Sequence, residues 1–215
     1  MRTMTALICV ISAAVLFGCG TSGTGPEFQP VEPADYHERL TVEDVFHNIV
    51  TAYEYMEAAP YLDCLAEDFE FFPTEEDVQN PELEIPPVWW KPDERELHEN
   101  MFDDDSNVER ISLTLTISNI IYDYGNPEDD TDDTCVCVVD VDLRVILLGD
   151  VILLANAQSE YNMRIDVDQW STEPETEGDN LWEIHEWWDL DSGRRGADSS
   201  PVESSSWGGI KSLYR

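Results

Sequence analysis

Residues 134–148 constrain the fold most, because apolar and polar side chains alternate strictly along TCVCVVDVDLRVILL. One set of alternate positions is entirely apolar: Cys135, Cys137, Val139, Val141, Leu143, Val145 and Leu147. The other set carries Asp140, Asp142 and Arg144. A period of two is typical of a strand with one buried and one solvated side. Because strands usually have about five or six residues, we predict a long strand that bends with a twisted sheet.

The charge of the chain limits its partners. Asp and Glu number 47 against 11 Lys and Arg, which gives a formal net charge of −36. Such a field repels phosphates, so we expect no binding to DNA or RNA. The charge predicts an acidic, well-solvated surface, and cation binding is the alternative interpretation. Nothing in the sequence indicates a cofactor.

The first 18 residues have the pattern of a secretory signal peptide, with Arg2 before a short apolar run. Residues 16–19 read LFGC. This resembles the lipobox of bacterial lipoproteins, which implies cleavage before Cys19 and lipid on its sulfur and amino group. Two or more acyl chains anchor a protein stably. In a Gram-negative cell, Gly20 at the next position implies sorting to the outer membrane, facing the periplasm or the cell surface. The alternative is a secreted protein cleaved nearby.

Composition divides the rest of the chain into three parts. Residues 19–40 are rich in Gly, Ser, Thr and Pro and are predicted to form a flexible tether. Residues 41–191 carry the periodic patterns and form the predicted domain. Residues 192–215 are predicted to be a mobile tail, in which 207–215 forms a helical turn that docks on the domain; a disordered end is the alternative.

Three cysteines remain after Cys9 and Cys19 are set aside. Cys135 and Cys137 lie two residues apart on one strand, where a mutual disulfide is strained. We expect three buried free thiols; in an oxidising compartment Cys64 pairs with Cys135 or Cys137 instead.

Helical patterns dominate residues 41–102. Residues 41–59 have apolar spacing typical of a helix, and Thr41 with Asp44 predicts a capping box at its start. Pro60 is predicted to end this helix. Residues 61–67 are predicted to form a second short helix, 68–73 a strand, and 93–102 a third helix.

Strand patterns dominate residues 108–190. Residues 108–123 alternate, and the side chains predicted to share the inner face are Ile111, Leu113, Leu115, Ile117 and Ile121. Asn119 interrupts this row. Residues 123–133 form an acidic loop without the spacing of an EF-hand. Residues 151–154 are left unassigned, and 159–168 predict another strand. In the last strand, 180–190, Trp182, Ile184 and Trp188 are predicted to share one face with Glu186.

The order of these elements resembles the nuclear transport factor 2-like superfamily, which includes ketosteroid isomerase, scytalone dehydratase and SnoaL-like proteins. The resemblance is carried by Tyr53, by 68–71 (DFEF), and by Trp182, Ile184, Trp187, Trp188 and Asp189. It implies an α+β fold, a cystatin-like roll in which a cone-shaped curved antiparallel sheet packs on N-terminal helices. Many members are enzymes and many only bind, so the fold does not decide function.

The resemblance directs attention to polar groups on the inner face. The candidates for a catalytic site are Glu186, Tyr53, Asn119 and His98. Glu94 and His98 lie four apart on a predicted helix, a spacing more typical of a surface pair than of a metal site, and the four histidines show no metal-ligand spacing. Trp90, Trp182 and Trp188 are candidates to line a groove for a small apolar ligand.

Three hypotheses follow, and the sequence favours the first. In the first hypothesis, the protein is a lipid-anchored, non-catalytic binding or interaction module of the bacterial cell envelope. Alternatively, it is an isomerase- or dehydratase-type enzyme that uses Glu186 with Tyr53. The third hypothesis is a structural envelope protein that forms a homodimer through the solvated strand face at Asp140, Asp142 and Arg144.

Overall fold

The computed structural model describes residues 33–124, 133–149, 151–165, 181–190, 203–204 and 207–214. The predicted signal peptide, Cys19 and most of the predicted tether lie outside these residues, as do most of the acidic loop and most of the tail. All described residues except Pro33 belong to one unit, Ala34–Arg215. Its elements are α1 (Val42–Tyr55), α2 (Ala58–Asp63), β1 (Leu65–Phe72), α3 (Glu75–Gln79), β2 (Trp89–Trp90), α4 (Lys91–Met101), β3 (Val108–Asp123), β4 (Thr134–Leu147), β5 (Val151–Ile165), β6 (Trp182–Leu190), β7 (Glu203–Ser204) and α5 (Trp207–Ser212).

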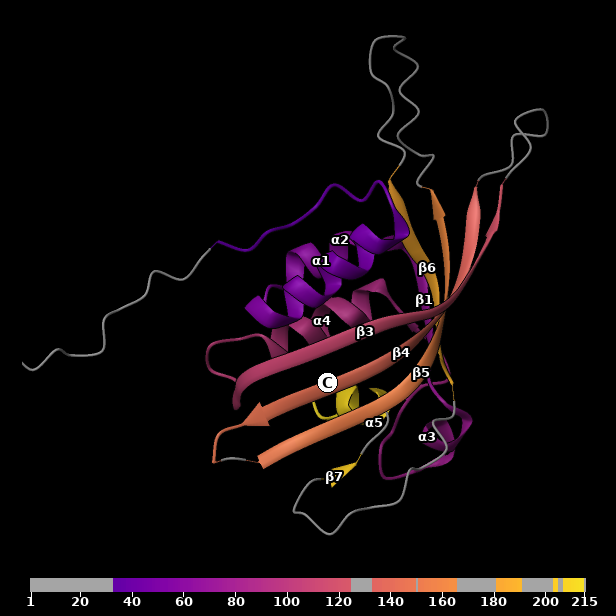
Figure 1. The fold of residues 1–215 in the computed structure, drawn as a ribbon. Helices are drawn as coiled ribbons and strands as arrows, with labels where there is room; N and C mark the ends of the chain where they lie inside the picture. The colour runs from indigo at the N-terminus through magenta and orange to yellow at the C-terminus, as the bar shows by residue number, and fades with distance from the viewer. Residues whose placement is uncertain are drawn as a thin grey trace, which may run out of the picture. The chain divides into compact units, whose positions relative to one another are not determined.

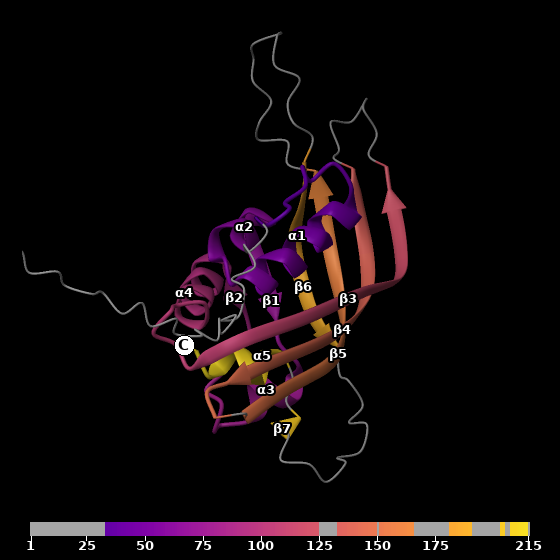
Figure 2. The same ribbon diagram turned by 60° about the vertical axis from the view of Figure 1, so that its left-hand side comes forward.

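A curved sheet with the strand order β2-β1-β6-β5-β4-β3 forms the body of this unit, and β7 pairs with β5. Neighbours along this order are antiparallel except β1 and β6, which are parallel. Helices α1, α2 and α4 lie over one face of the sheet (Figures 1 and 2). The predicted α+β class, a curved sheet packed on N-terminal helices, is confirmed.

The apolar row of β4 faces this helical layer, as the alternation predicts. Cys135, Cys137, Val139, Val141, Leu143 and Val145 are all buried. Asp140, Asp142 and Arg144 are exposed on the outer face, where Asp140 accepts a hydrogen bond from the Gln158 amide at 3.1 Å. Cys64, Cys135 and Cys137 are free thiols in the structure.

The unassigned segment 151–154 is the start of β5. Strands β4 and β5 pair without interruption from Thr134–Arg164 to Leu147–Val151. Gly149, in the short connection between them, has a φ of 88°, a left-handed conformation that glycine adopts without steric cost. The two strands therefore form one long hairpin.

Helix α1 begins as predicted, with the Thr41 hydroxyl accepting from the Asp44 N–H at 3.2 Å and the Asp44 carboxylate accepting from the Thr41 N–H at 3.1 Å. Its end was predicted too late. Met56 adopts a left-handed φ of 55° and caps the helix, so Pro60 lies inside the first turns of α2 instead of ending α1. The predicted helix over 61–67 is also wrong beyond Asp63, because Leu65 already begins β1.

Two β-bulges reverse the face of several predicted residues. Ile117 and Asn119 pair with the adjacent residues Val139 and Val138, so Ser118 is an extra residue in β3. Beyond it, Ile121 is 60% exposed and Asn119 is exposed too, against the predicted inner row. An inserted residue shifts every later side chain to the opposite face.

The second bulge lies in β6. Ile184 and Glu186 pair with the adjacent residues Met163 and Asn162, which makes His185 the extra residue. The predicted row of Trp182, Ile184, Glu186 and Trp188 is therefore wrong beyond Ile184. Trp187 and Asp189 are buried on the inner side, whereas Trp188 is 39% exposed.

The described helices are all too short or too polar to span a lipid bilayer.

Candidate functional site

Five polar side chains meet beneath the helical layer; we call them the inner polar cluster. They are Tyr53 from α1, Tyr61 from α2, Glu94 and His98 from α4, and Lys211 from α5. All five are buried, and Glu94 and His98 have no exposed surface. Buried polar groups require partners, since an unpaired one costs about 1–3 kcal/mol. The cluster supplies these partners internally.

His98 is held between the backbone and Tyr53. Its Nδ1 lies 2.8 Å from the Glu94 carbonyl, which only accepts, so Nδ1 carries the proton. Its Nε2 lies 2.5 Å from the Tyr53 hydroxyl, which therefore donates to it. Burial, reinforced by the nearby Lys211 charge, holds the pKa of His98 well below its usual range. Burial and the Glu94 carboxylate raise the pKa of Tyr53 well above its usual range, so both groups are neutral.

Glu94 is the charged centre of the cluster. Its Oε1 contacts the Lys211 ammonium, and its Oε2 accepts from the Tyr61 hydroxyl at 2.9 Å. Burial lowers the pKa of Lys211, while Glu94 and Asp189 act in the opposite direction. The His98 ring also stacks on Tyr61, with 3.9 Å between ring centroids. Every member thus contacts another member.

Aromatic rings enclose the Lys211 ammonium on its other sides. The nitrogen lies 3.9 Å from the Phe71 centroid, 4.5 Å from that of Trp187 and 5.6 Å from that of Trp89. The three rings belong to β1, β6 and β2 and are buried. A cation within about 6 Å of a ring centroid is attracted by the ring quadrupole. We call Glu94 and these three rings the lysine cage.

The cluster corrects one prediction. The spacing of Glu94 and His98 was interpreted as a surface pair, but both side chains are fully buried. The interior also contains Lys211 and the buried carboxylate of Asp189. The sequence pattern missed Glu94 because the neighbouring helical positions Glu96 and Glu99 are exposed acidic residues, which gave the whole segment a solvated appearance.

The remaining candidate residues do not join this cluster. Glu186 lies on the outer side of β6, where its Oε2 accepts from the Asn162 amide at 2.6 Å and from the Trp188 indole at 3.1 Å. Asn119 is exposed on β3. Only Tyr53 and His98 among the predicted catalytic candidates lie together in the interior.

The three tryptophans predicted to line a ligand groove lie in different places and do not form one groove. Trp182 is buried, and Trp90 is 54% exposed on β2, with its indole N–H 3.3 Å from Glu70. Trp188 alone of the three lines a surface groove, whose volume is about 410 Å³. The groove is bounded by Phe72, Pro73, Thr74, Glu75, Val78, Pro87, Trp188, Asp189 and Leu190.

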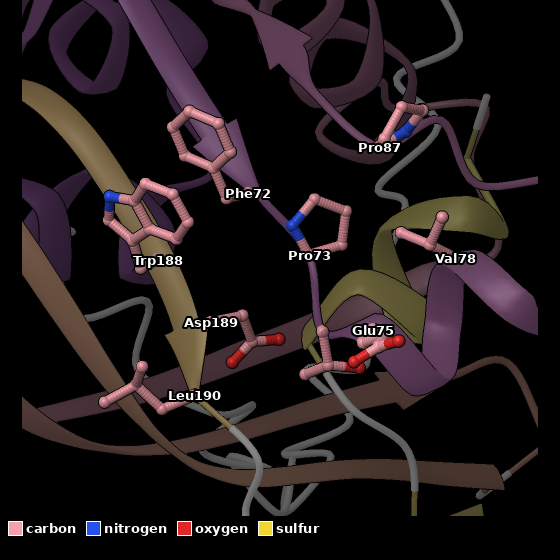
Figure 3. A pocket seen from close by; sticks show the side chains of 9 residues that line it. Phe72, Pro73, Glu75, Val78, Pro87, Trp188, Asp189 and Leu190 are labelled. Atoms are coloured by element: carbon pink, nitrogen blue, oxygen red, sulfur yellow. The ribbon is translucent and has the colours of Figure 1, made fainter.

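The walls of this groove are largely apolar (Figure 3). Trp188 stacks on Phe72 with ring centroids 3.8 Å apart and an interplanar angle of 8°. Pro73, Val78 and Pro87 lie on the other side of the hollow, from the end of β1, α3 and the segment before β2. Two carboxylates, Glu75 and Asp189, add negative charge. The groove can therefore hold an apolar group beside a flat aromatic surface.

One set of exposed side chains has donors suited to a divalent transition metal. Single ligand atoms of Asp35, His37 and His47 lie within 4.8 Å of one another. His37 and His47 stack with centroids 3.9 Å apart, and His37 Nδ1 lies 2.9 Å from the Asp44 carboxylate. Imidazole and carboxylate ligands are common at such metals. Their separation in sequence hid this proximity, since only His47 lies on the helix.

Comparisons with known proteins identify a fold and no family. No family model matches the chain, and no curated protein matches it. A conserved protein from Planctomyces limnophilus is 11% identical, with a TM-score of 0.50 over 69% of this chain and 91% of that one. At this identity the similarity concerns the fold alone.

Two further solved structures have lower scores. A ketosteroid isomerase-like protein from Erwinia carotovora atroseptica is 10% identical, with a TM-score of 0.45 over 71% of this chain and 96% of that one. A hexachlorocyclohexane dehydrochlorinase from Novosphingobium barchaimii is 11% identical, with a TM-score of 0.44 over 74% of this chain and 94% of that one.

Proposed function

We propose that the protein is a non-catalytic binding module of the bacterial cell envelope, and that the groove beside Trp188 takes a small apolar ligand. One observation carries the non-catalytic part: the interior is occupied by a side chain of the protein itself. Lys211 engages Glu94, and Tyr53 and His98 engage each other. While α5 is docked, these groups are buried and satisfied by one another, so they are closed to a substrate.

The groove supports the binding part of the proposal. Its volume of about 410 Å³ lies at the small end of the range for ligand sites, roughly 300–1,000 Å³. Its apolar wall is fixed, because Trp188 is stacked on Phe72 and its indole N–H donates to Glu186. A rigid aromatic wall costs little entropy on binding. The ligand is therefore expected to carry a flat apolar ring.

Fluorescence of the neutral probe N-phenyl-1-naphthylamine tests this site. Trp188→Ala removes one wall of the groove and is expected to weaken probe binding about tenfold, which is the loss of one stacked aromatic contact. Trp90→Ala is the matched control, since Trp90 is also exposed but does not line the groove. Equal affinity of wild type and Trp188→Ala for the probe would show that the groove is not the binding site and would contradict this part of the proposal.

The alternative is an isomerase- or dehydratase-type enzyme, and one observation favours it. Tyr53 and His98 form a neutral hydrogen-bonded pair beside a buried carboxylate, Glu94. Such a pair can transfer a proton to or from a substrate that reaches it. If turnover of any small carbonyl compound is found, His98→Gln should lower kcat at least about a hundredfold. If turnover is unchanged in His98→Gln but lost in Glu186→Gln, the active site lies at Glu186 on the outer face and not in the inner polar cluster.

The lipid anchor is a separate part of the proposal and is supported by residues 16–19. Incorporation of an alkyne-labelled fatty acid into the full chain, expressed in a Gram-negative bacterium, tests it. Label is expected in wild type and should be absent in Cys19→Ser, which also should leave the outer-membrane fraction. Label retained in Cys19→Ser would contradict lipidation at this residue.

A further inference from the structure

All four residues of the lysine cage belong to the sheet or to α4. Phe71, Trp89 and Trp187 come from three adjacent strands, and Glu94 comes from α4. Phe71 and Trp187 meet edge to face, with centroids 5.4 Å apart at 83°. Tyr61 fixes the carboxylate through its 2.9 Å hydrogen bond. Only the cation comes from α5, near the end of the chain.

The segment that supplies the cation is small. Helix α5 has six residues, and it lies beside β5 on the same side of the sheet as α4 (Figure 2). Ile210 and Lys211 are its deeply buried side chains among the described residues, and the Asn100 amide donates to the Tyr214 carbonyl at 3.0 Å. Removal of α5 from this place would leave the cage with all four of its walls.

A carboxylate facing several aromatic rings is the chemistry that recognises an alkylammonium ion. The net charge of −36 also concentrates cations near the protein. Lysine is rare here: Lys91 and Lys211 are the two lysines of the sequence. We infer that the lysine cage is a binding site for an organic ammonium ion, that Lys211 occupies it as an internal ligand, and that α5 is displaced when such a ligand binds. This site is separate from the groove beside Trp188.

Chemical rescue tests the cage directly. Lys211→Ala deletes three methylene groups and an amine, and n-propylammonium supplies the same atoms. The variant is expected to melt at a lower temperature than wild type, and n-propylammonium chloride should restore at least half of the difference. Sodium chloride at the same ionic strength should not. Restoration no greater than that by sodium chloride overturns the inference.

Lys91→Ala is the matched control. It removes the same atoms, but the Lys91 ammonium lies 2.8 Å from the Leu65 carbonyl and 2.7 Å from Glu67, whose side chain is 92% exposed. Lys91 is buried as well, but its carboxylate partner is open to solvent, and no aromatic ring of the described residues contacts its ammonium as the rings of the cage contact Lys211, so n-propylammonium should not stabilise this variant. Equal rescue of both variants would mean a general effect of the amine and would also overturn the inference.

Displacement of α5 is tested on chains that keep Lys211, which covers the case in which Lys211→Ala does not fold. Acetylation of the two lysines is followed by mass spectrometry. Tetramethylammonium does not react with the reagent and fits an aromatic cage, so it should raise the acetylation rate of Lys211 several-fold in wild type beyond the effect of sodium chloride. An unchanged rate contradicts displacement.

Gly208→Val provides the positive control for an undocked helix. A β-carbon at Gly208 would lie 2.9 Å from the Asp77 carboxylate and 3.3 Å from Pro73, so a branched side chain forces α5 or these neighbours to move. This variant leaves all cage residues in place and should acetylate Lys211 at least about tenfold faster than wild type, with Lys91 unchanged. Protection of Lys211 equal to wild type would show that α5 does not hold it in the cage.

Discussion

The two faces of the β1–β6 pair carry the same types of residue in opposite environments. Phe71 pairs with Trp187 on the inner face, and Phe72 pairs with Trp188 on the outer face. Each aromatic pair lies near a glutamate: Glu94 inside, reached through Lys211, and Glu186 outside, bound by the Trp188 indole. Composition alone therefore does not distinguish the two regions.

Burial separates their chemistry. The inner face encloses a charge that must be neutralised by a cation, because an isolated buried charge is too costly. On the outer face Glu186 is half-buried and still reached by water, and an amide and an indole suffice as its partners. The comparison teaches that a charged partner is required only where water is excluded. The predictions below test that rule, from the largest expected effect to the smallest.

Truncation of the two glutamates should have very different costs. Glu94→Ala leaves the Lys211 ammonium buried without its carboxylate and is expected to lower the free energy of unfolding by about 3–5 kcal/mol. Glu186→Ala exposes its donors to water and is expected to cost about 1 kcal/mol or less. Urea denaturation measures both. Equal costs would mean that the two environments do not differ as described.

Removing both charges of the inner pair should cost less than removing one. Glu94→Gln keeps an acceptor for Tyr61, and Lys211→Met keeps the length of the side chain inside the rings. Each single variant leaves one buried charge without its partner, whereas the double variant contains neither charge. We expect a coupling energy of at least about 2 kcal/mol in the double-mutant cycle.

The same cycle at Asn162→Leu and Glu186→Gln is the outer-face control. Its partners are half-buried and include a neutral amide, so their coupling should stay at or below about 1 kcal/mol. Additive effects at Glu94 and Lys211 would contradict a neutralising role for Lys211.

The alternation of polar and apolar residues was sufficient to predict the body of the fold. The buried row of β4 and the capping box of α1 follow from local patterns, because side-chain period and cap chemistry act within a few residues. The curved sheet on helices was implied by the resemblance that the order of elements carries, and the structure confirms it.

The inner face of the site could not be predicted in this way. Glu186 and Trp188 lie on the outer side because His185 is an extra residue in β6, and an alternating sequence contains no mark of such an insertion. Tryptophans at both 187 and 188 made either register equally apolar. Lys211 lies 117 positions after Glu94 in the sequence, so no local pattern connects them.

The pH dependence of stability should reveal the neutral histidine of the inner cluster. The pKa of His98 in the folded protein lies well below 6.5, whereas the unfolded chain takes up a proton near that value. Below pH 6.5 the unfolded state therefore binds more protons, and the free energy of unfolding falls as the pH falls. One proton corresponds to about 1 kcal/mol over the first pH unit below 6.5.

His98→Gln removes this contribution, so its free energy of unfolding should fall less steeply than that of wild type between pH 6.5 and about pH 5.5. Tyr53→Phe is the control, since it deletes the hydroxyl that donates to Nε2 but leaves the imidazole buried. That variant should be less stable at every pH and keep the wild-type slope. If His98→Gln also keeps the wild-type slope, His98 takes up its proton equally in both states, and the inner face would be open to water like the outer one.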